Sequence, residues 1–220
     1  MKNTYLYILA FLALVLASTW FFVQKNPVSK PKLPYFGFDA FDSTFVNRKL
    51  IIDTIYHKIP DFSFASQTGD SVSLKTTENK IYVADFFFVN CPGICVKMAK
   101  QMQRVYAAYK DNPNVVILSH TVNPEEDSIA ILMEYAKKQG VIDHKKWIFL
   151  TGTKPKLYQM ARLGYYVTAT EGDGGNDDFV HTEKFVLIDK NRNIRGYYDG
   201  TNENEVNKML FDMDILLAEK

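Results

Sequence analysis

The stretch Phe86-Phe87-Phe88-Val89-Asn90-Cys91-Pro92-Gly93-Ile94-Cys95 contains both cysteines of the chain and marks the junction of two elements. The apolar run that leads to Cys91 predicts a buried strand over 80–89, and segment 96–110 has the composition and the repeating apolar face of a helix. Cys91 and Cys95 are therefore expected across the first turn of that helix. Their i,i+4 spacing lets the two side chains point the same way.

The start of a helix favours sulfur chemistry, because its free N–H groups and the positive end of its dipole stabilise thiolates. Such a pair can close a disulfide, exchange disulfides with another protein, or hold a soft metal ion. The alternative is a purely structural disulfide. A loop this short contributes little loop-closure stability, so we expect exchangeable chemistry.

The N-terminal segment is apolar, and residues 5–23 carry no charge. A helix of that length crosses a hydrocarbon core of about 30 Å, so we expect an uncleaved transmembrane signal anchor over residues 1–24. The alternative is a cleaved secretory signal, but no small-x-small cleavage site precedes Trp20, Phe21 and Phe22. The lysines on the two sides of the segment do not orient it.

The rest of the chain divides into a tether and one domain. Residues 25–50 contain three prolines and show no firm periodicity, as expected of a tether that holds a domain off a membrane. Residues 51–220 have the length of one ordinary domain, and 47% of the chain is hydrophobic, which is ample for a core. The formal net charge is +1, without a basic stripe, so nucleic acid is not an expected partner.

Predicted strands and helices alternate along this domain and end in a hairpin and a helix. This order predicts an α/β sheet with helices on both faces, and the natural candidate is a thioredoxin-like topology. The expected strands are 61–64, 71–74, 80–89, 114–119, 147–150, 184–189 and 194–198, and the expected helices are 96–110, 123–140, 153–164 and a last one from about residue 202.

Asp85 lies in the middle of the first central strand, where an unpaired acid is costly. It precedes Cys91 by six residues. In this spacing the segment resembles thioredoxins, in which a buried aspartate helps to move a proton to or from a thiol, so Asp85 is a candidate proton relay. The alternative is a structural acid at a sheet edge or beside a lysine. The loop departs from thioredoxins, because three residues rather than two separate Cys91 from Cys95.

Four motifs together resemble the SCO/SenC family, which consists of membrane-anchored, thioredoxin-fold copper proteins of cytochrome c oxidase assembly. The resemblance extends from about residue 60 to the C-terminus. The motifs are the cysteine loop 91–95, the stretch His120-Thr121-Val122-Asn123-Pro124-Glu125-Glu126-Asp127, the strand 147–152, and Val180-His181-Thr182 before the strand 185–189.

The resemblance implies a single copper ion bound by Cys91, Cys95 and His181. Thiolates suit Cu(I), and an imidazole makes the same site acceptable to Cu(II). Zinc is the alternative metal, but a structural zinc site normally recruits a fourth protein ligand, and none is evident in the sequence. The implied partners are an upstream copper donor and the cytochrome c oxidase subunit that carries CuA, or another cuproprotein. The implied location is the bacterial inner (cytoplasmic) membrane, with a single-pass helix and the domain on the extracytoplasmic (periplasmic) side.

The sequence departs from the family pattern beside both cysteines. Gly93 stands where an acidic residue is common, and Val96 stands where a proline is common. Neither position supplies a ligand, so these changes concern loop rigidity and copper affinity. The acidic, glycine-rich segment 171–178 before His181 is either a solvated loop or a hinge that lets His181 move on and off the metal.

Three functions fit these patterns to different degrees. The first is a membrane-tethered copper-binding assembly factor that delivers copper to, or matures, a CuA site, and such a metallochaperone is not an enzyme. The second is a thiol-disulfide oxidoreductase that reduces target cysteines and has no obvious need of His181. The third, a peroxiredoxin-like peroxidase, is disfavoured because no threonine-proline-rich loop surrounds Cys91. Five other potential ligands receive structural interpretations, as surface or capping histidines and core methionines: His57, His120, His144, Met98 and Met102.

Overall fold

The computed structural model describes residues 2–25, 31–46, 49–168 and 182–219, and it contains two compact units, Met1–Lys32 and Leu33–Lys220. In the first unit, residues Lys2–Lys25 form helix α1 over the apolar segment. None of the helices in these described ranges is both long enough and apolar enough to span a membrane. The transmembrane anchor expected over residues 1–24 is therefore not confirmed.

The second unit is built on a seven-stranded sheet with the order β4-β3-β7-β6-β5-β8-β9. The central strands β5, β6 and β7 are parallel, whereas β8 pairs antiparallel with β5 and β3 pairs antiparallel with β7. The strands are β3 (Ser63–Ser66), β4 (Ser71–Ser73), β5 (Ile81–Phe87), β6 (Val115–Thr121), β7 (Trp147–Thr151), β8 (Lys184–Ile188) and β9 (Ile194–Asp199).

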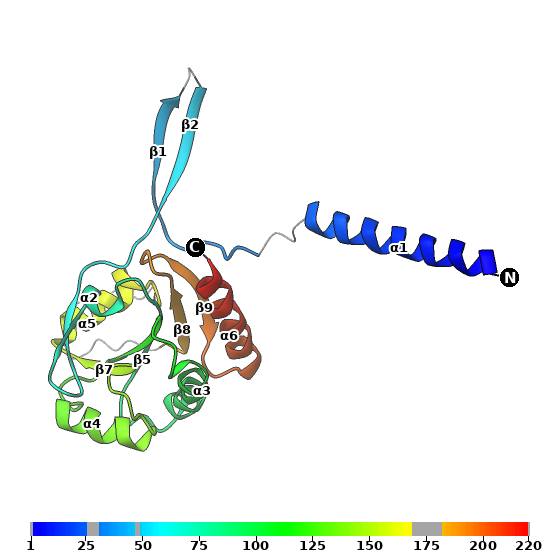
Figure 1. Cartoon of the computed structure of the whole chain (residues 1–220). Coiled ribbons are helices and arrows are strands. Elements are labelled where there is room, and N and C mark those ends of the chain that lie inside the picture. The colour runs from blue at the N-terminus through cyan, green and yellow to red at the C-terminus, as the bar shows by residue number, and fades with distance from the viewer. Residues whose placement is uncertain (1, 26–30, 47–48, 169–181, 220) are drawn as a thin grey trace. The chain divides into compact units, whose positions relative to one another are not determined.

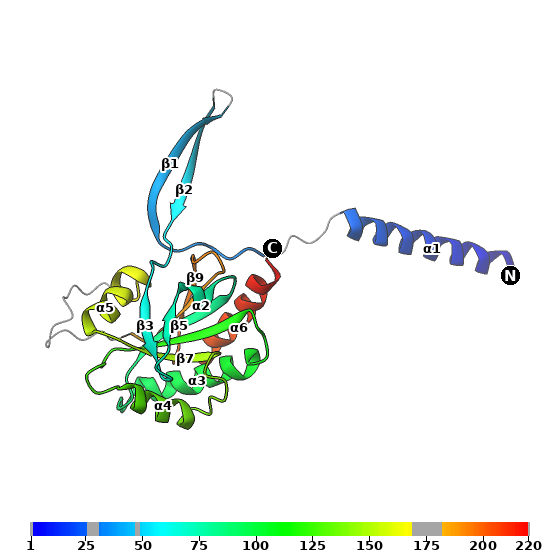
Figure 2. The same cartoon turned by 60° about the vertical axis from the view of Figure 1, so that its left-hand side comes forward.

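Helices cover both faces of this sheet (Figures 1 and 2). Successive side chains of a strand point to opposite faces, so each central strand contributes to two cores. Val83 packs in the core beneath α3 (Ile94–Tyr109), α4 (Ile129–Lys138) and α6 (Glu203–Ala218), whereas its neighbour Tyr82 packs with α5 (Lys154–Gln159) and the π-helical turn η1 (Met160–Gly164). The short helix α2 (Leu74–Thr77) follows β4. The predicted α/β, thioredoxin-like architecture is confirmed.

One predicted helix start is wrong. The sequence Asn123-Pro124-Glu125-Glu126 has the pattern of a helix start, but α4 begins at Ile129 with Ser128 as its N-cap. The loop between β6 and α4 is bound to β6 instead, because the Thr121 hydroxyl accepts a hydrogen bond from the Asn123 N–H and donates one to the Asp127 carboxylate.

A separate hairpin, β1 (Phe38–Val46) and β2 (Lys49–Tyr56), lies partly in the range expected as a tether. It projects from the rest of the second unit, as Figures 1 and 2 show. A register shift between Phe38 and Ala40 interrupts the alternation of side chains along β1. Such a bulge disturbs the two-residue period by which strands are recognised in a sequence. This explains why the sequence pattern did not indicate strand β1.

Candidate metal centre

The two cysteines lie where strand β5 leads into helix α3. Cys91 is in the connecting loop, where its N–H donates to the Phe88 carbonyl, and Cys95 is the second residue of α3. Cys91 is half-buried and Cys95 is 7% exposed. Both thiols are free, and they lie close enough for each to affect the acidity of the other. Cys95 lies in the first helical turn as expected, whereas Cys91 lies in the loop just before the helix.

The two thiols have different acidities. Burial by itself raises the pKa of Cys91, but hydrogen bonds from the Cys95 thiol and from the N–H groups of Gly93 and Cys95 outweigh it and hold that pKa below its usual value. Burial raises the pKa of Cys95 to about 12, and the neighbouring Cys91 and Asp85 act in the same direction. Cys91 is therefore the sulfur that ionises first, as the more exposed member of a pair at a helix start should.

Two cavities open beside the thiols. One, of about 280 Å³, is lined by both cysteines, by Val122 after β6 and by Thr182 before β8. The other, of about 360 Å³, lies between α3 and α4 and is lined by both cysteines together with Gln103 and Tyr135. The cysteine pair is thus accessible from two sides.

His181, the expected third ligand, lies outside the described residues. Its neighbour Thr182 is described and lines the smaller cavity with Cys91 and Cys95. The assignment of His181 as a ligand stays a prediction. Among the residues whose placement is given, no group of three or more His, Cys, Asp or Glu side chains could hold a metal ion.

Asp85 is buried beneath α3 and has a defined hydrogen-bond chain. The Trp147 indole N–H donates to the Ser119 hydroxyl, which in turn donates to the Asp85 carboxylate. Burial raises the pKa of Asp85 to about 7, although the Ser119 hydrogen bond acts in the opposite direction. Because its charge also raises the pKa of Cys95, Asp85 is coupled electrostatically to the thiol pair. The proton relay itself remains a prediction.

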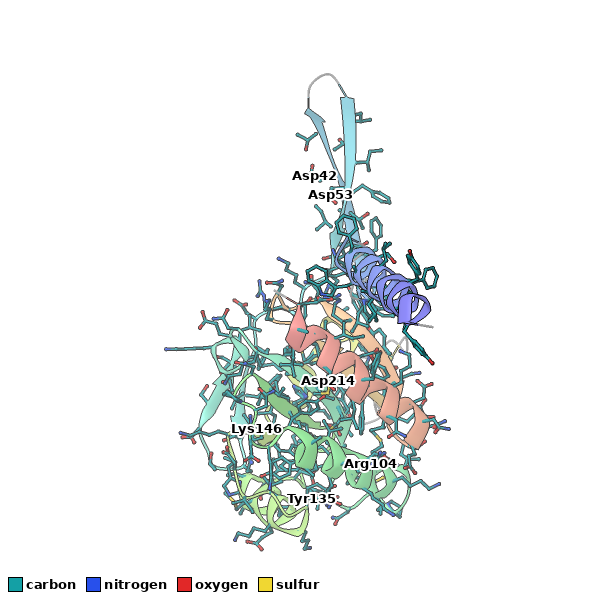
Figure 3. The ribbon with its side chains drawn as sticks, turned by 45° about the vertical axis from the view of Figure 1, so that its right-hand side comes forward. Asp42, Asp53, Arg104, Tyr135, Lys146 and Asp214 are labelled. Carbon is teal, nitrogen blue, oxygen red and sulfur yellow. The ribbon has the colours of Figure 1, made fainter. Side chains whose placement is uncertain are left out.

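Asp127 and Tyr135 belong to this site, although Asp127 was expected only as part of the resemblance stretch 120–127 and Tyr135 not at all. Both carboxylate oxygens of Asp127 accept a hydrogen bond from the Val89 N–H, at 3.3 and 3.2 Å, which positions the start of the cysteine loop. Tyr135, labelled on α4 in Figure 3, stacks on Phe87 at 5.1 Å, and its pKa is raised by burial and by the nearby Asp85 and cysteines. Asp127 lies six residues after Thr121, the last residue of β6, and a carboxylate at that spacing does not by itself indicate a functional site.

Of the three histidines predicted to be surface or capping residues, His120 differs from that expectation, whereas His57 caps the last carbonyl of η1. His120 is fully buried, and His57 is buried with its Nε2–H donating to the Gly164 carbonyl at 2.8 Å. His144 is partly exposed. Met98 and Met102 are buried in the core, as predicted.

The donor set therefore fits a soft metal ion. Two free thiols, one with a lowered pKa, lie together at a helix start and face a cavity that the residue after His181 also lines. The same geometry also fits thiol-disulfide exchange, because Cys91 is the more exposed and more acidic sulfur.

Comparisons with known proteins agree with this geometry. A model of the SCO1/SenC family matches residues 54–212. The SCO1 protein homolog of Bacillus subtilis (strain 168) is 27% identical over 164 residues, which cover 74% of this chain and 84% of that protein.

Two solved structures share the fold. The structure of BsSco, described as a member of the Sco family of cytochrome c oxidase assembly proteins, superimposes with a TM-score of 0.62 at 25% identity and covers 74% of this chain and 95% of its own. Arabidopsis thaliana ScoI with copper bound superimposes with a TM-score of 0.57 at 23% identity, and the coverage is 72% and 99%.

Proposed function

Because the chain belongs to the SCO1/SenC family, we propose that it binds copper and takes part in the maturation of the CuA site of cytochrome c oxidase or of a related cuproprotein. The observation that carries the proposal is the free thiol pair at the start of α3, which lines one cavity with Thr182. The relative BsSco, described as a cytochrome c oxidase assembly protein, supports the same assignment.

The proposed ligands are Cys91, Cys95 and His181. A copper ion held by these ligands could be either Cu(I) or Cu(II) in the same site. The chain's own contribution is to hold the two sulfurs together at the start of α3 and to keep Cys91 easily ionised, since a metal binds the thiolate rather than the thiol. Asp127 holds the loop that carries Cys91, through the Val89 N–H.

The proposed setting is a membrane surface on the extracytoplasmic side of the cell. The described side chains of α1 include several large, exposed apolar groups, among them Phe11, Leu14 and Trp20, which suit attachment to lipid. The proposed partners are a copper donor and the protein that carries the target site. The proposed division of the chain is residues 1–24 for attachment, 25–50 as the link and 51–220 as the copper-binding domain.

A thiol-disulfide oxidoreductase is the second candidate function. The observation that favours it is the asymmetry of the pair, since Cys91 is more exposed and more acidic than Cys95. An attacking and a resolving thiol differ in this way. Reduction of the cysteines in a target protein would need no metal.

Copper binding by the reduced full chain in detergent micelles tests the proposal. We expect one tightly held copper per chain after gel filtration, and with Cu(II) a thiolate-to-copper charge-transfer absorption. The double variant Cys91→Ser with Cys95→Ser should lose both signals, whereas Met98→Leu, which removes a buried thioether from the same helix, should keep them. The oxidised protein should bind no copper, because a disulfide offers no thiolate. Stoichiometric copper in the double variant would contradict the assignment.

Substitution of His181 separates the two candidate functions. We expect His181→Ala to weaken Cu(II) binding more than Cu(I) binding, because two sulfurs satisfy Cu(I) whereas Cu(II) gains more from a nitrogen ligand. Thiol-disulfide exchange with a model disulfide should stay at the wild-type rate. If exchange were lost while both copper affinities held, the oxidoreductase function would replace copper delivery.

A further inference from the structure

A third cavity, of about 450 Å³, shares no lining residue with the two cavities beside the cysteines. It is formed by the loop after β2, by α2 and its following loop, and by the turn between β8 and β9. Four of its lining residues are basic, Lys58, Lys75, Lys190 and Arg192, and one is acidic, Glu78. The cavity is therefore strongly cationic.

The basic side chains have few anionic partners within the described parts of the chain. Lys190 donates to the carbonyl oxygen of Glu219 at 3.2 Å, and neither Lys58 nor Lys75 forms an ion pair with any residue that the structure describes. Arg192 contacts Asp61 at 3.2 Å, but the Asp61 side chain is 91% exposed, so this pair is screened by water. The positive charges that line the cavity are thus largely uncompensated.

The backbone at Arg192 supplies an independent observation. Its φ angle is +72°, in the left-handed region, where glycine is favoured and a long side chain is strained. The turn itself is held by Asp189, whose carboxylate accepts the N–H groups of Asn191 and Asn193, both at 2.9 Å. None of these turn contacts uses the Arg192 side chain, so the turn has no need of a guanidinium at a position that suits glycine.

We propose that this cavity binds a phosphate group. The planar guanidinium of Arg192 can form two parallel hydrogen bonds to phosphate oxygens, and the lysine ammonium groups add point charges around it. The group can belong to a free phosphate compound or to a phospholipid headgroup, since both present the same oxygens. The inference is independent of the thiol site and of copper.

Binding of two probes to the full chain in non-ionic detergent tests the proposal by isothermal titration calorimetry at constant ionic strength. Inorganic phosphate represents the free compound, and a short-chain phosphatidylglycerol below its critical micelle concentration represents the headgroup. We expect saturable binding of at least one probe. The probe that binds more tightly identifies the source of the phosphate.

Arg192→Gly is the decisive variant, because glycine fits the positive φ angle and keeps the turn folded while the guanidinium is removed. We expect about tenfold weaker binding, as for the loss of one hydrogen bond to a charged group. Lys75→Gln should weaken binding in the same direction. Lys145→Gln, which removes the same charge from an exposed position outside the cavity, should bind as the wild type does. Absence of saturable binding of both probes, or equal binding by Arg192→Gly and the wild type, would overturn the proposal.

Discussion

Asp85 connects the thiol site to the centre of the sheet. It is 4% exposed, it receives a hydrogen bond from Ser119, and its charge raises the pKa of Cys95. A carboxyl group that burial holds at a pKa of about 7 is protonated in the folded state at a pH where it is ionised in the unfolded chain. Asp85 therefore affects both the stability of the fold and the acidity of the thiol.

We predict that Asp85→Asn removes a pH dependence of stability. The folded pKa of about 7 lies above the ordinary value of 3.8, so the wild type loses stability as the pH rises from about 4 to 7. A pKa shift of that size corresponds to a loss of roughly 4 kcal/mol in the free energy of unfolding. Urea unfolding at pH 5 and pH 8 should show that Asp85→Asn is more stable than the wild type mainly at pH 8.

The same variant tests the proton relay. Without the Asp85 charge, the pKa of Cys95 should fall, and the rate of thiol exchange should lose its inflection near pH 7. A variant that is stabilised but keeps the wild-type pH profile of exchange would show that Asp85 has only a structural role.

His120 is a second buried titratable residue, on the opposite face of the sheet. Its ring stacks on Phe86 at 5.0 Å, and neither ring nitrogen forms a hydrogen bond of normal geometry within the described chain. Burial lowers its pKa to about 4, although the backbone at Asp85 and Leu118 acts in the opposite direction. A neutral, unsatisfied imidazole in a core costs stability.

We predict that His120→Phe stabilises the protein most at low pH. The folded pKa of about 4 lies below the ordinary value of 6.5, so the wild type loses stability as the pH falls from 6.5 towards 4. Phenylalanine keeps the aromatic contacts and removes the titration, so urea unfolding should show a gain of about 1–3 kcal/mol that is larger at pH 5 than at pH 8. His144→Phe, which adds the same aromatic side chain at a partly exposed position, is the control and should not give this gain. A destabilised His120→Phe at both pH values would contradict this prediction.

At the scale of elements, the hairpin β1–β2 contrasts with the sheet. Its strands pair with each other, and Phe41 and Ile52 are more than 60% exposed. Asp42 lies directly opposite Asp53, as the register shows and as the labels of Figure 3 indicate. Like charges at directly opposed positions destabilise a strand pair, and an isolated hairpin is marginally stable in any case.

We predict that Asp53→Asn strengthens the hairpin. The substitution removes the repulsion from Asp42 and keeps a side-chain oxygen to accept the hydrogen bond from the Thr54 N–H. Amide hydrogen exchange in residues 38–56 should become slower. The change should correspond to a gain of about 0.2–1 kcal/mol in the free energy of opening the hairpin. The difference from the wild type should shrink in 1 M salt, which screens the repulsion. Faster exchange in the variant would show that the two carboxylates do not repel.

At the scale of the whole second unit, Arg195 joins the two ends of that unit to the sheet. Its side chain is 2% exposed and donates to the carbonyls of Leu33 and Pro34, at 2.7 and 3.0 Å. It also pairs with Asp189 and, through two nitrogens, with Glu219. The chain that enters the domain and the chain that leaves it are therefore fixed by one buried guanidinium.

We predict that Arg195→Ala destabilises the domain by about 3–5 kcal/mol, because it leaves the Asp189 carboxylate buried without its cation. Urea unfolding measures the loss, and limited proteolysis should detect earlier cleavage near residue 33. Arg104→Ala is the control, since that partly exposed arginine pairs with a 71% exposed Glu203 and should cost less than about 1 kcal/mol. Equal losses in the two variants would contradict the role of Arg195.

The sequence by itself determined the order of the seven strands of the sheet and the position of the two thiols. The strands β5, β6 and β7 are apolar runs, and the start of α6 is set by the Asn202 side chain, which accepts the N–H groups of Asn204 and Glu205. Cys91 and Cys95 are placed by the end of a strand and the first turn of a helix. All of these signals act between residues a few positions apart, so they can be read from the chain alone.

Only the tertiary structure decided what surrounds those elements. The Asp127 carboxylate holds the N–H of Val89, 38 positions away in the sequence, and Thr182 lines the cavity beside Cys91 because β8, which follows Thr182, pairs with β5. His120 and His144 are the same residue type, yet one is fully buried and the other is partly exposed. Burial, pKa shifts and cavities come from contacts between distant segments, and such contacts exist only once the chain has packed.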